Sequence, residues 1–241
     1  MASFPIQGLS FDVGGTLIDV WPSVGHAYAR VAARHGCADL EPSLLTERFL
    51  AAWRERSPGF DYSRDSWAAV VRSTFAHAGA LAQDPVFFHD LYNHFAKAEP
   101  WRVYPDVVPI LQTLRLRGFK LAVTSNWDDR LRPLLGDLQL LSYFDYITVS
   151  GELGVHKPHR AIFSATANGL GLPPESIVHV GDHWTEDVLG ARAAGMKAVH
   201  LRRGGIQGSE GVEGLGELWA YLGVDGRGGG GEPNLGSGSG Q

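Results

Sequence analysis

Hydrophobic positions along the chain follow two different periods. Short apolar runs of strand length occur at residues 9–13, 119–124, 144–149, 176–180 and 197–201. Between the later runs, apolar side chains recur at helical spacing in residues 105–117, 131–138, 160–170 and 186–194. Strands that alternate with helices predict a parallel sheet that is covered on both faces. Right-handed crossovers then bring the carboxyl ends of all five strands to one edge of that sheet.

Residues 21–97 break this alternation, because helical patterns there follow one another without strands between them. Candidate helices lie at residues 24–35, 43–56, around 67–75 and at 86–95, separated by Gly and Pro clusters. We interpret the aromatic side chains of Trp53, Trp67, Phe75 and Phe88 as the core of this helical insert. The predicted fold is therefore a three-layer, Rossmann-like α/β core, residues 1–20 and 98–224, with an inserted α-helical unit at 21–97.

Composition narrows the class of protein. The 241 residues are 44% hydrophobic and 20% charged, as in ordinary globular proteins, and the net charge of −5 argues against a nucleic-acid surface. Cys37 is the single cysteine, which excludes an internal disulfide and a cysteine metal cluster. No signal-peptide pattern and no apolar run of membrane-spanning length is present, so we expect a cytoplasmic protein without membrane contact. The glycine-rich residues 225–241 are predicted to be a disordered tail.

Four segments carry candidate chemistry. They are FDVGGTL at residues 11–17, LAVTSN at 121–126, HKP at 156–158 and VGDHWTED at 180–187. Asp12 follows a strand and precedes a Gly-Gly turn, so its side chain is expected in the crevice where α/β sheets bind ligands. The second and fourth segments likewise end strands in polar residues, which places a hydroxyl, an amide and further carboxylates at the same edge.

In their order along the chain, these four segments resemble the motifs of the haloacid dehalogenase-like hydrolase superfamily, over about residues 7–222. Most members of this superfamily are phosphatases, so the resemblance implies phosphatase activity for this chain. It also implies that the helical insert is a cap over the site. It further implies that Asp12 is the nucleophile and forms an aspartyl-phosphate intermediate. Mg²⁺ would be held by Asp12, Asp182 and the backbone carbonyl of Gly14, with Asp187 holding a metal-bound water or Lys157.

The resemblance gives the remaining site residues roles toward the substrate phosphate. Ser125 would contribute its hydroxyl, and Asn126 would orient either the loop or the substrate. Lys157 would balance the negative charge of the carboxylates and the phosphoryl group, as a compact cation does at phosphate sites. The resemblance thus implies the catalytic set Asp12, Ser125 and Lys157. We expect the substrate to be a small phosphorylated molecule and the protein to be a monomer or homodimer.

One position departs from the family pattern. The family carries a second Asp two residues after the nucleophile, which protonates the leaving group and then activates water, whereas this chain has Gly14. Another acid could serve, such as water, His156, His183 or His26. Alternatively the leaving group needs no acid, or the chain has lost catalysis and binds a ligand or partner.

The fourth motif favours phosphoryl chemistry among these alternatives. Family members that remove halide need no metal and lack the Gly-Asp pattern, but this chain keeps Gly181, Asp182 and Asp187. Relatives that cleave carbon–phosphorus bonds use a cap lysine, and the insert contains only Lys97, at its edge. We therefore expect a Mg²⁺-dependent phosphatase of low activity. A catalytically impaired binding protein and a 2-haloacid dehalogenase-type hydrolase are the alternatives.

Overall fold

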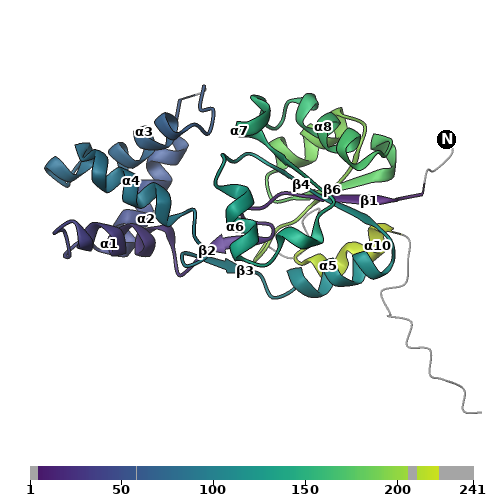
Figure 1. The fold of residues 1–241 in the computed structure, drawn as a ribbon, viewed down its shortest axis with the longest axis horizontal. Coiled ribbons are helices and arrows are strands. Elements are labelled where there is room, and N and C mark those ends of the chain that lie inside the picture. The colour runs from purple at the N-terminus through teal and green to yellow at the C-terminus, as the bar shows by residue number, and fades with distance from the viewer. Residues whose placement is uncertain (1–4, 58, 206–210, 223–241) are drawn as a thin grey trace, which may run out of the picture.

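Five parallel strands form the centre of the molecule (Figure 1). The computed structural model describes residues 5–57, 59–205 and 211–222. The strand order is β5-β4-β1-β6-β7, with β1 at Gly8–Phe11, β4 at Lys120–Ser125, β5 at Tyr146–Val149, β6 at Ile177–Gly181 and β7 at Lys197–His200. Each strand coincides with one of the apolar runs, so the predicted parallel sheet is confirmed.

Helices cover both faces of the sheet and make it the middle of three layers (Figure 1). One face carries α5 at Val107–Leu116, α6 at Leu131–Asp137 and α10 at Leu218–Leu222; the other carries α7 at Ser150–Leu153, α8 at Arg160–Leu170 and α9 at Gly190–Ala193. Alternation along β1 sets the layers, because Leu9 and Phe11 pack in the α5 cluster while Ser10 points to the α8 face. Each buried Leu or Phe contributes about 1.5–3 kcal/mol to the fold.

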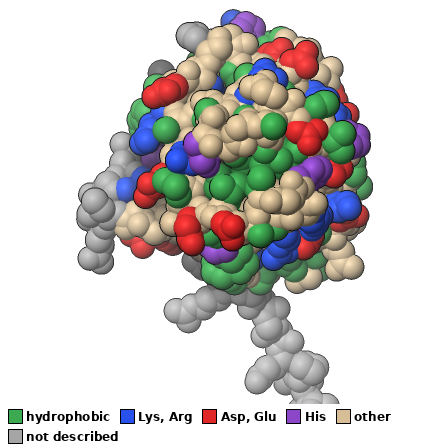
Figure 2. Space-filling view, turned by 90° about the vertical axis from the view of Figure 1, so that its left-hand side faces the viewer, with side chains coloured by type: hydrophobic (Ala, Val, Ile, Leu, Met, Phe, Trp, Pro, Cys, Tyr) green, Lys and Arg blue, Asp and Glu red, His purple; other side chains and the backbone are tan. Residues whose placement is uncertain are grey.

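The helical insert lies beside the sheet as a separate helical unit (Figure 1). Its α-helices are α1 at Val24–Arg34, α2 at Pro42–Arg54, α3 at Arg64–Thr74 and α4 at Pro85–His94. The side chains of Ser23, Ser63 and Asp84 cap the amino ends of α1, α3 and α4. The insert has hydrophobic clusters of its own, in which Tyr28 and Phe75 stack at 5.6 Å. Figure 2 views this helical end, where hydrophobic side chains gather between charged ones.

A short antiparallel ribbon lies where the insert joins the core. It pairs β2, Ile18–Val20, with β3, Trp101–Val103, and its last pair sets Val20 opposite Trp101. The ribbon was not predicted from the sequence. Both chain crossings between core and insert therefore leave from adjacent points.

Other differences from the sequence pattern lie near the strand ends. The helix expected at residues 186–194 begins earlier, as a π-helical turn at Trp184–Leu189 that leads into α9. The short helix α7 was also not predicted, while α8 has the predicted bounds. Within the described residues, no helix is both long and apolar enough to cross a membrane. The predicted disordered tail, residues 225–241, lies outside the described part of the chain.

Candidate active site

Asp12 is placed by the end of β1 and by the turn that follows it. Its backbone N–H donates to the carbonyl of Val180 at 2.9 Å, which holds it between the carboxyl ends of β1 and β6. The turn needs Gly15, whose φ is +73° and whose added Cβ would lie 2.4 Å from a carboxylate oxygen of Asp182. A side chain at position 15 would push the carboxylate of Asp182 away from that of Asp12, so the Gly-Gly turn permits the close approach of these two carboxylates.

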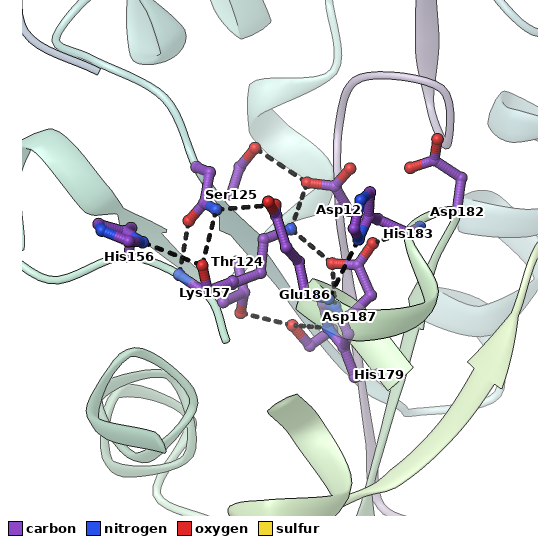
Figure 3. Close-up of polar contacts among 12 residues, drawn as sticks. Asp12, Thr124, Ser125, His156, Lys157, His179, Asp182, His183, Glu186 and Asp187 are labelled. Atoms are coloured by element: carbon purple, nitrogen blue, oxygen red, sulfur yellow. Dashed lines mark hydrogen bonds and ion pairs between the residues drawn. The ribbon is translucent and has the colours of Figure 1, made fainter. Parts of the chain in front are cut away.

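Three of the predicted site residues meet at one carboxylate oxygen (Figure 3). Oδ1 of Asp12 accepts hydrogen bonds from the Ser125 hydroxyl at 3.0 Å and from Nζ of Lys157 at 2.6 Å. Ser125 and Lys157 are 1% and 2% exposed, so the ammonium group has left water almost completely. The predicted catalytic set is therefore one hydrogen-bonded cluster, in which the second oxygen of Asp12 receives no bond from the described residues.

Lys157 is stabilised by a second carboxylate. Its Nζ also donates to Oδ1 of Asp187 at 2.6 Å. Burial alone would lower the pKa of Lys157, but the charges of Asp12 and Asp187 outweigh it and raise that pKa above its ordinary value. Burial would likewise raise the pKa of Asp187, yet Lys157 and His179 hold it below the usual range. The lysine therefore remains charged between two carboxylates.

The carboxylates of Asp12, Asp182 and Asp187 form an acidic group whose oxygens lie within 4.8 Å of one another. Asp182 opens toward the cavity, but the surrounding protein desolvates it, and the charges of Asp12 and Asp187 add to this effect; together they raise its pKa to about 7. Lys157 compensates only part of this negative charge. An excess of carboxylate oxygens at the open side suits a hard divalent cation.

The contacts of Asp187 distinguish it from the other two carboxylates. Its Oδ1 accepts from Lys157 and lies 3.2 Å from Nε2 of His179, and its Oδ2 accepts from the backbone N–H of His183 at 2.9 Å. Both oxygens are therefore engaged by protein. Asp12 and Asp182 keep free oxygens that could hold a metal directly, while the position of Asp187 suits the support of Lys157.

Asn126 binds protein atoms on all sides. Its Oδ1 accepts from the backbone N–H of Lys157 at 2.7 Å, and its Nδ2 lies within hydrogen-bond distance of the Lys157 carbonyl, Glu186 and the Tyr62 hydroxyl. The amide thus fixes the loop that carries the lysine and reaches a residue of the insert. Of the two roles that the resemblance allows, this geometry favours orientation of the loop.

A buried chain of hydroxyl groups behind the site was not anticipated; Figure 3 labels Thr124 and His179 of this chain. His179 Nδ1 lies 3.1 Å from the Ser10 hydroxyl, which lies 2.7 Å from that of Thr124. Thr124 and Thr148 both reach the Thr166 hydroxyl, at 2.6 and 2.7 Å. We call these five residues the sheet relay.

The hydrogen positions in the sheet relay follow from its far end. Thr166 donates to the carbonyl of Ile162 in the preceding turn of α8, so its oxygen accepts from both Thr124 and Thr148. Thr124 is also hydrogen-bonded to Ser10, and Ser10 to Nδ1 of His179. Because a carboxylate only accepts, Nε2 of His179 donates to Asp187. Polar residues at inward positions of four strands were the sequence signal for this relay.

The three histidines considered as substitute acids lie in different places. Only His183 lines the cavity that contains Asp12. His156 lines a neighbouring cavity, and His26 is bound to Ser23 at the start of α1. At His183, Nδ1 accepts from the backbone N–H of Glu186, so the other ring nitrogen can face the cavity.

Gly14 lies against an aromatic ring. A Cβ added there would be 3.5 Å from the edge of the Trp127 indole, which itself packs on Trp101 at 5.3 Å. The position where the family has its second Asp is thus bordered by apolar surface. Trp127 directly follows Ser125 and Asn126 in sequence, but nothing in the pattern indicated that its ring would turn back toward the first motif.

The cavity continues from the acidic group into the helical insert and encloses about 370 Å³. Trp53, Trp67 and Phe88 line it, although we interpreted them as bundle core. Phe75 is fully buried, whereas these three pack against the hydrophobic clusters of the insert with one side and line the cavity with another. The difference arises because helical periodicity shows which face is apolar and does not show whether that face meets protein or a cavity.

Fold and site together define a class: a Rossmann-like α/β protein in which a carboxylate at the end of the first strand is bound by a serine and a buried lysine. A family model described as haloacid dehalogenase-like hydrolase matches residues 6–195. The chain belongs to this family of hydrolases.

Three similar proteins illustrate the range of the relatives. The haloacid dehalogenase-like hydrolase domain-containing protein 3 of Danio rerio is 35% identical over 83% of this chain and 86% of its own length. A glyceraldehyde 3-phosphate phosphatase of Methanopyrus kandleri is 42% identical over 54% of each chain. The crystal structure of a HAD phosphatase from Thermococcus onnurineus has a TM-score of 0.68 at 27% identity and covers 91% of this chain and 99% of that one.

Proposed function

We propose that this hydrolase is a Mg²⁺-dependent phosphatase of small molecules and that Asp12 is its nucleophile. The observation that carries the proposal is the Asp12 cluster, in which Ser125 and Lys157 bind and orient a carboxylate at the end of β1 beside the carboxylates of Asp182 and Asp187. The phosphatase names of the archaeal relative and of the similar solved structure support the same chemistry. The helical insert would act as the cap that encloses the substrate.

The proposed reaction has two steps, and Asp12 takes part in both. Asp12 attacks phosphorus in line, a new bond forms between its oxygen and phosphorus, and the ester oxygen leaves with the bonding pair. Lys157 and the Ser125 hydroxyl offset charge on the phosphoryl oxygens. Water then cleaves the aspartyl phosphate, releases phosphate and restores the carboxylate.

Asp12, Asp182 and the Gly14 carbonyl would hold the metal. Mg²⁺, when bound there, supplies positive charge to the phosphoryl oxygens. Asp187 would keep Lys157 in position. Gly14 supplies no proton, so turnover of esters with poor leaving groups should be slow, because general acid catalysis commonly contributes about 10²–10⁴-fold.

The test is phosphate release from an activated aryl phosphate, with and without Mg²⁺, because this leaving group departs without a proton. We expect release that requires the metal and falls by at least about 10³-fold in Asp12→Asn. Folded protein that releases no more phosphate than Asp12→Asn would leave a ligand-binding protein as the better interpretation. Chloride release from a 2-chloro acid without metal would instead indicate a dehalogenase.

A further inference from the structure

The part of the cavity beyond the catalytic cluster is unusually aromatic. Ten aromatic side chains line it, including Trp53 and Trp67 from the insert and Trp101 and Trp127 from the core. Trp53 and Trp67 stack on each other at 5.4 Å with their planes 12° apart. Flat rings on several sides of one cavity bind another flat ring better than they bind a flexible polar molecule.

Arg130 and Asn126, two polar side chains among these rings, are already engaged by protein, whereas the indole N–H of Trp67 is buried without a hydrogen-bond partner among the residues that the structure describes. Arg130 donates to both carboxylate oxygens of Asp128, at 2.8 and 2.6 Å, and to the carbonyl of Tyr92 at 3.0 Å. Asn126 binds Glu186 and the Tyr62 hydroxyl. A substrate rich in hydroxyl groups would lose water on entering and regain few hydrogen bonds, which costs affinity for every unpaired group.

The volume agrees with a ring-sized occupant. An apolar protein cavity of about 150 Å³ holds a benzene molecule. The cavity of about 370 Å³ therefore has room for a phosphoryl group beside Asp12 and for one or two rings beyond it. In-line attack by Asp12 directs the leaving group away from the sheet edge and toward this aromatic part.

The acidic side chain that the family places two residues after the nucleophile is missing from this site. Gly14 has no side chain, and the Trp127 ring borders the space that a side chain would enter. An alkoxide, whose conjugate acid has a pKa of about 16 as for water, needs a proton to leave quickly. A phenolate needs it far less, because the pKa of a phenol is about 10.

We propose, on the basis of the phosphatase function above, that the substrate is an aryl phosphate: a phosphomonoester whose oxygen is carried on an aromatic ring. The ring occupies the aromatic part of the cavity, and the phosphoryl group meets Asp12, Ser125 and Lys157. The P–O bond breaks with its electron pair on the phenolate oxygen, which takes its proton from water after departure.

Binding tests the recognition of the ring without turnover. Phenylphosphonate and methylphosphonate carry the same anionic group and differ in the ring, and neither can be hydrolysed. In calorimetry of the Mg²⁺-loaded protein, we expect phenylphosphonate to bind at least about 10-fold more tightly. Equal affinities would overturn the aryl preference and leave the phosphatase proposal standing, whereas binding of neither, together with no phosphate release, would overturn both.

Turnover separates the ring from the leaving group. Phenyl phosphate and benzyl phosphate both carry a ring, but benzyl phosphate leaves as an alkoxide; glycerol phosphate has neither a ring nor a good leaving group. We expect similar KM values for the first two and a kcat about 10²-fold lower for benzyl phosphate. Glycerol phosphate should have the highest KM. A kcat/KM for glycerol phosphate that equals or exceeds that for phenyl phosphate would refute the inference.

Substitutions locate the ring in the cavity. Trp53→Leu should weaken phenylphosphonate binding by about 10-fold without changing methylphosphonate binding, which also shows that the variant is folded. Trp53→Phe keeps a ring and should retain most of the difference. Trp219→Leu is the matched control, because Trp219 lies on α10, outside the cavity lining. Unchanged phenylphosphonate binding in Trp53→Leu would contradict the assigned place of the ring.

Discussion

The charged side chains of the site are stabilised mainly by one another, because burial removes most of the water around them. Lys157 offsets part of the charge of Asp12 and Asp187, while Asp182 lies close to both carboxylates and forms no ion pair within residues 5–57, 59–205 and 211–222. The repulsion among these carboxylates lowers the stability of the folded protein, and a bound cation would relieve it. The residue that suits metal binding is therefore expected to destabilise the metal-free protein.

We predict that Asp182→Asn stabilises the metal-free protein at pH 8. The folded-state pKa of Asp182 is about 7, above its ordinary value of 3.8, so between these values the folded chain keeps a proton that the unfolded chain has lost. Stability of the wild type should therefore fall as pH rises from 4 to 7 and stay low above that range. Since the carboxylate opens on the cavity and is partly screened, the gain in Asp182→Asn should be about 1 kcal/mol.

Urea unfolding in a metal chelator at pH 5 and pH 8 measures this effect. The difference between Asp182→Asn and wild type should shrink toward pH 4, where both unfolded and folded wild type are protonated. The exposed Asp137→Asn on α6 serves as control and should show no such pattern. Wild-type stability that is equal at pH 5 and pH 8 would show that the repulsion is absent.

At the scale of elements, the loops after β1 and β4 meet at the point where catalysis would need a proton. The first supplies Gly14 and the second supplies Trp127, whose ring would contact any side chain at position 14. An acid introduced at position 14 would therefore lie in van der Waals contact with an apolar ring.

We predict that Gly14→Asp alone raises the turnover of benzyl phosphate only slightly. The double variant Gly14→Asp/Trp127→Ala gives the carboxyl group room and water, and should raise kcat by about 10–100-fold over either single variant. Phenyl phosphate, measured in parallel, should gain little because its leaving group needs no acid. A double variant that equals the single variants would show that another group already protonates the leaving oxygen.

The sheet relay links four strands to α8 through buried hydroxyl groups, and Thr166 is the acceptor on which it ends. Thr166→Val should cost about 1–3 kcal/mol, because it leaves the buried hydroxyl of Thr148 without a partner and that of Thr124 with Ser10 alone. Thr113→Val on α5 is a matched control: Thr113 makes the same bond to the carbonyl four residues earlier, but at the surface. Urea unfolding should show the loss in Thr166→Val alone, and equal losses would indicate a local helix effect.

For the whole molecule, the helical insert is joined to the core through one ribbon and packs mainly on itself. Its two hydrophobic clusters are distinct from the two that hold the sheet and its helices. Because Val20 and Trp101 face each other in the ribbon, the two crossings can be closed by a very short turn. The core should therefore fold without the insert.

We predict that replacing residues 21–100 with Asn-Gly yields a folded core in which β2 and β3 form a hairpin. A two-residue turn of this kind matches the twist of paired antiparallel strands. The variant should unfold cooperatively in urea. It should also bind phenylphosphonate and methylphosphonate with affinities that differ by less than about 3-fold, since the insert provides most of the rings. Failure to fold would show that core and insert form a single cooperative unit.

The sequence predicts those site residues that lie at the carboxyl ends of strands. Asp12, Ser125 and Asp182 each end or follow an apolar run, and parallel topology then brings them to one edge. The ribbon is hidden because its strands have three residues each and pair across about 80 positions of chain. The position of the Trp127 ring depends on the direction of a side chain in a loop, which hydrophobic periodicity does not predict.

The cavity lining has a spectroscopic consequence. Four of the seven tryptophans, Trp53, Trp67, Trp101 and Trp127, surround the proposed ring site. A large share of the ultraviolet emission of this protein therefore originates within contact distance of any ligand there. A nitro-substituted aromatic ligand would quench that emission on entry, so occupancy could be followed in the unlabelled, unmodified chain.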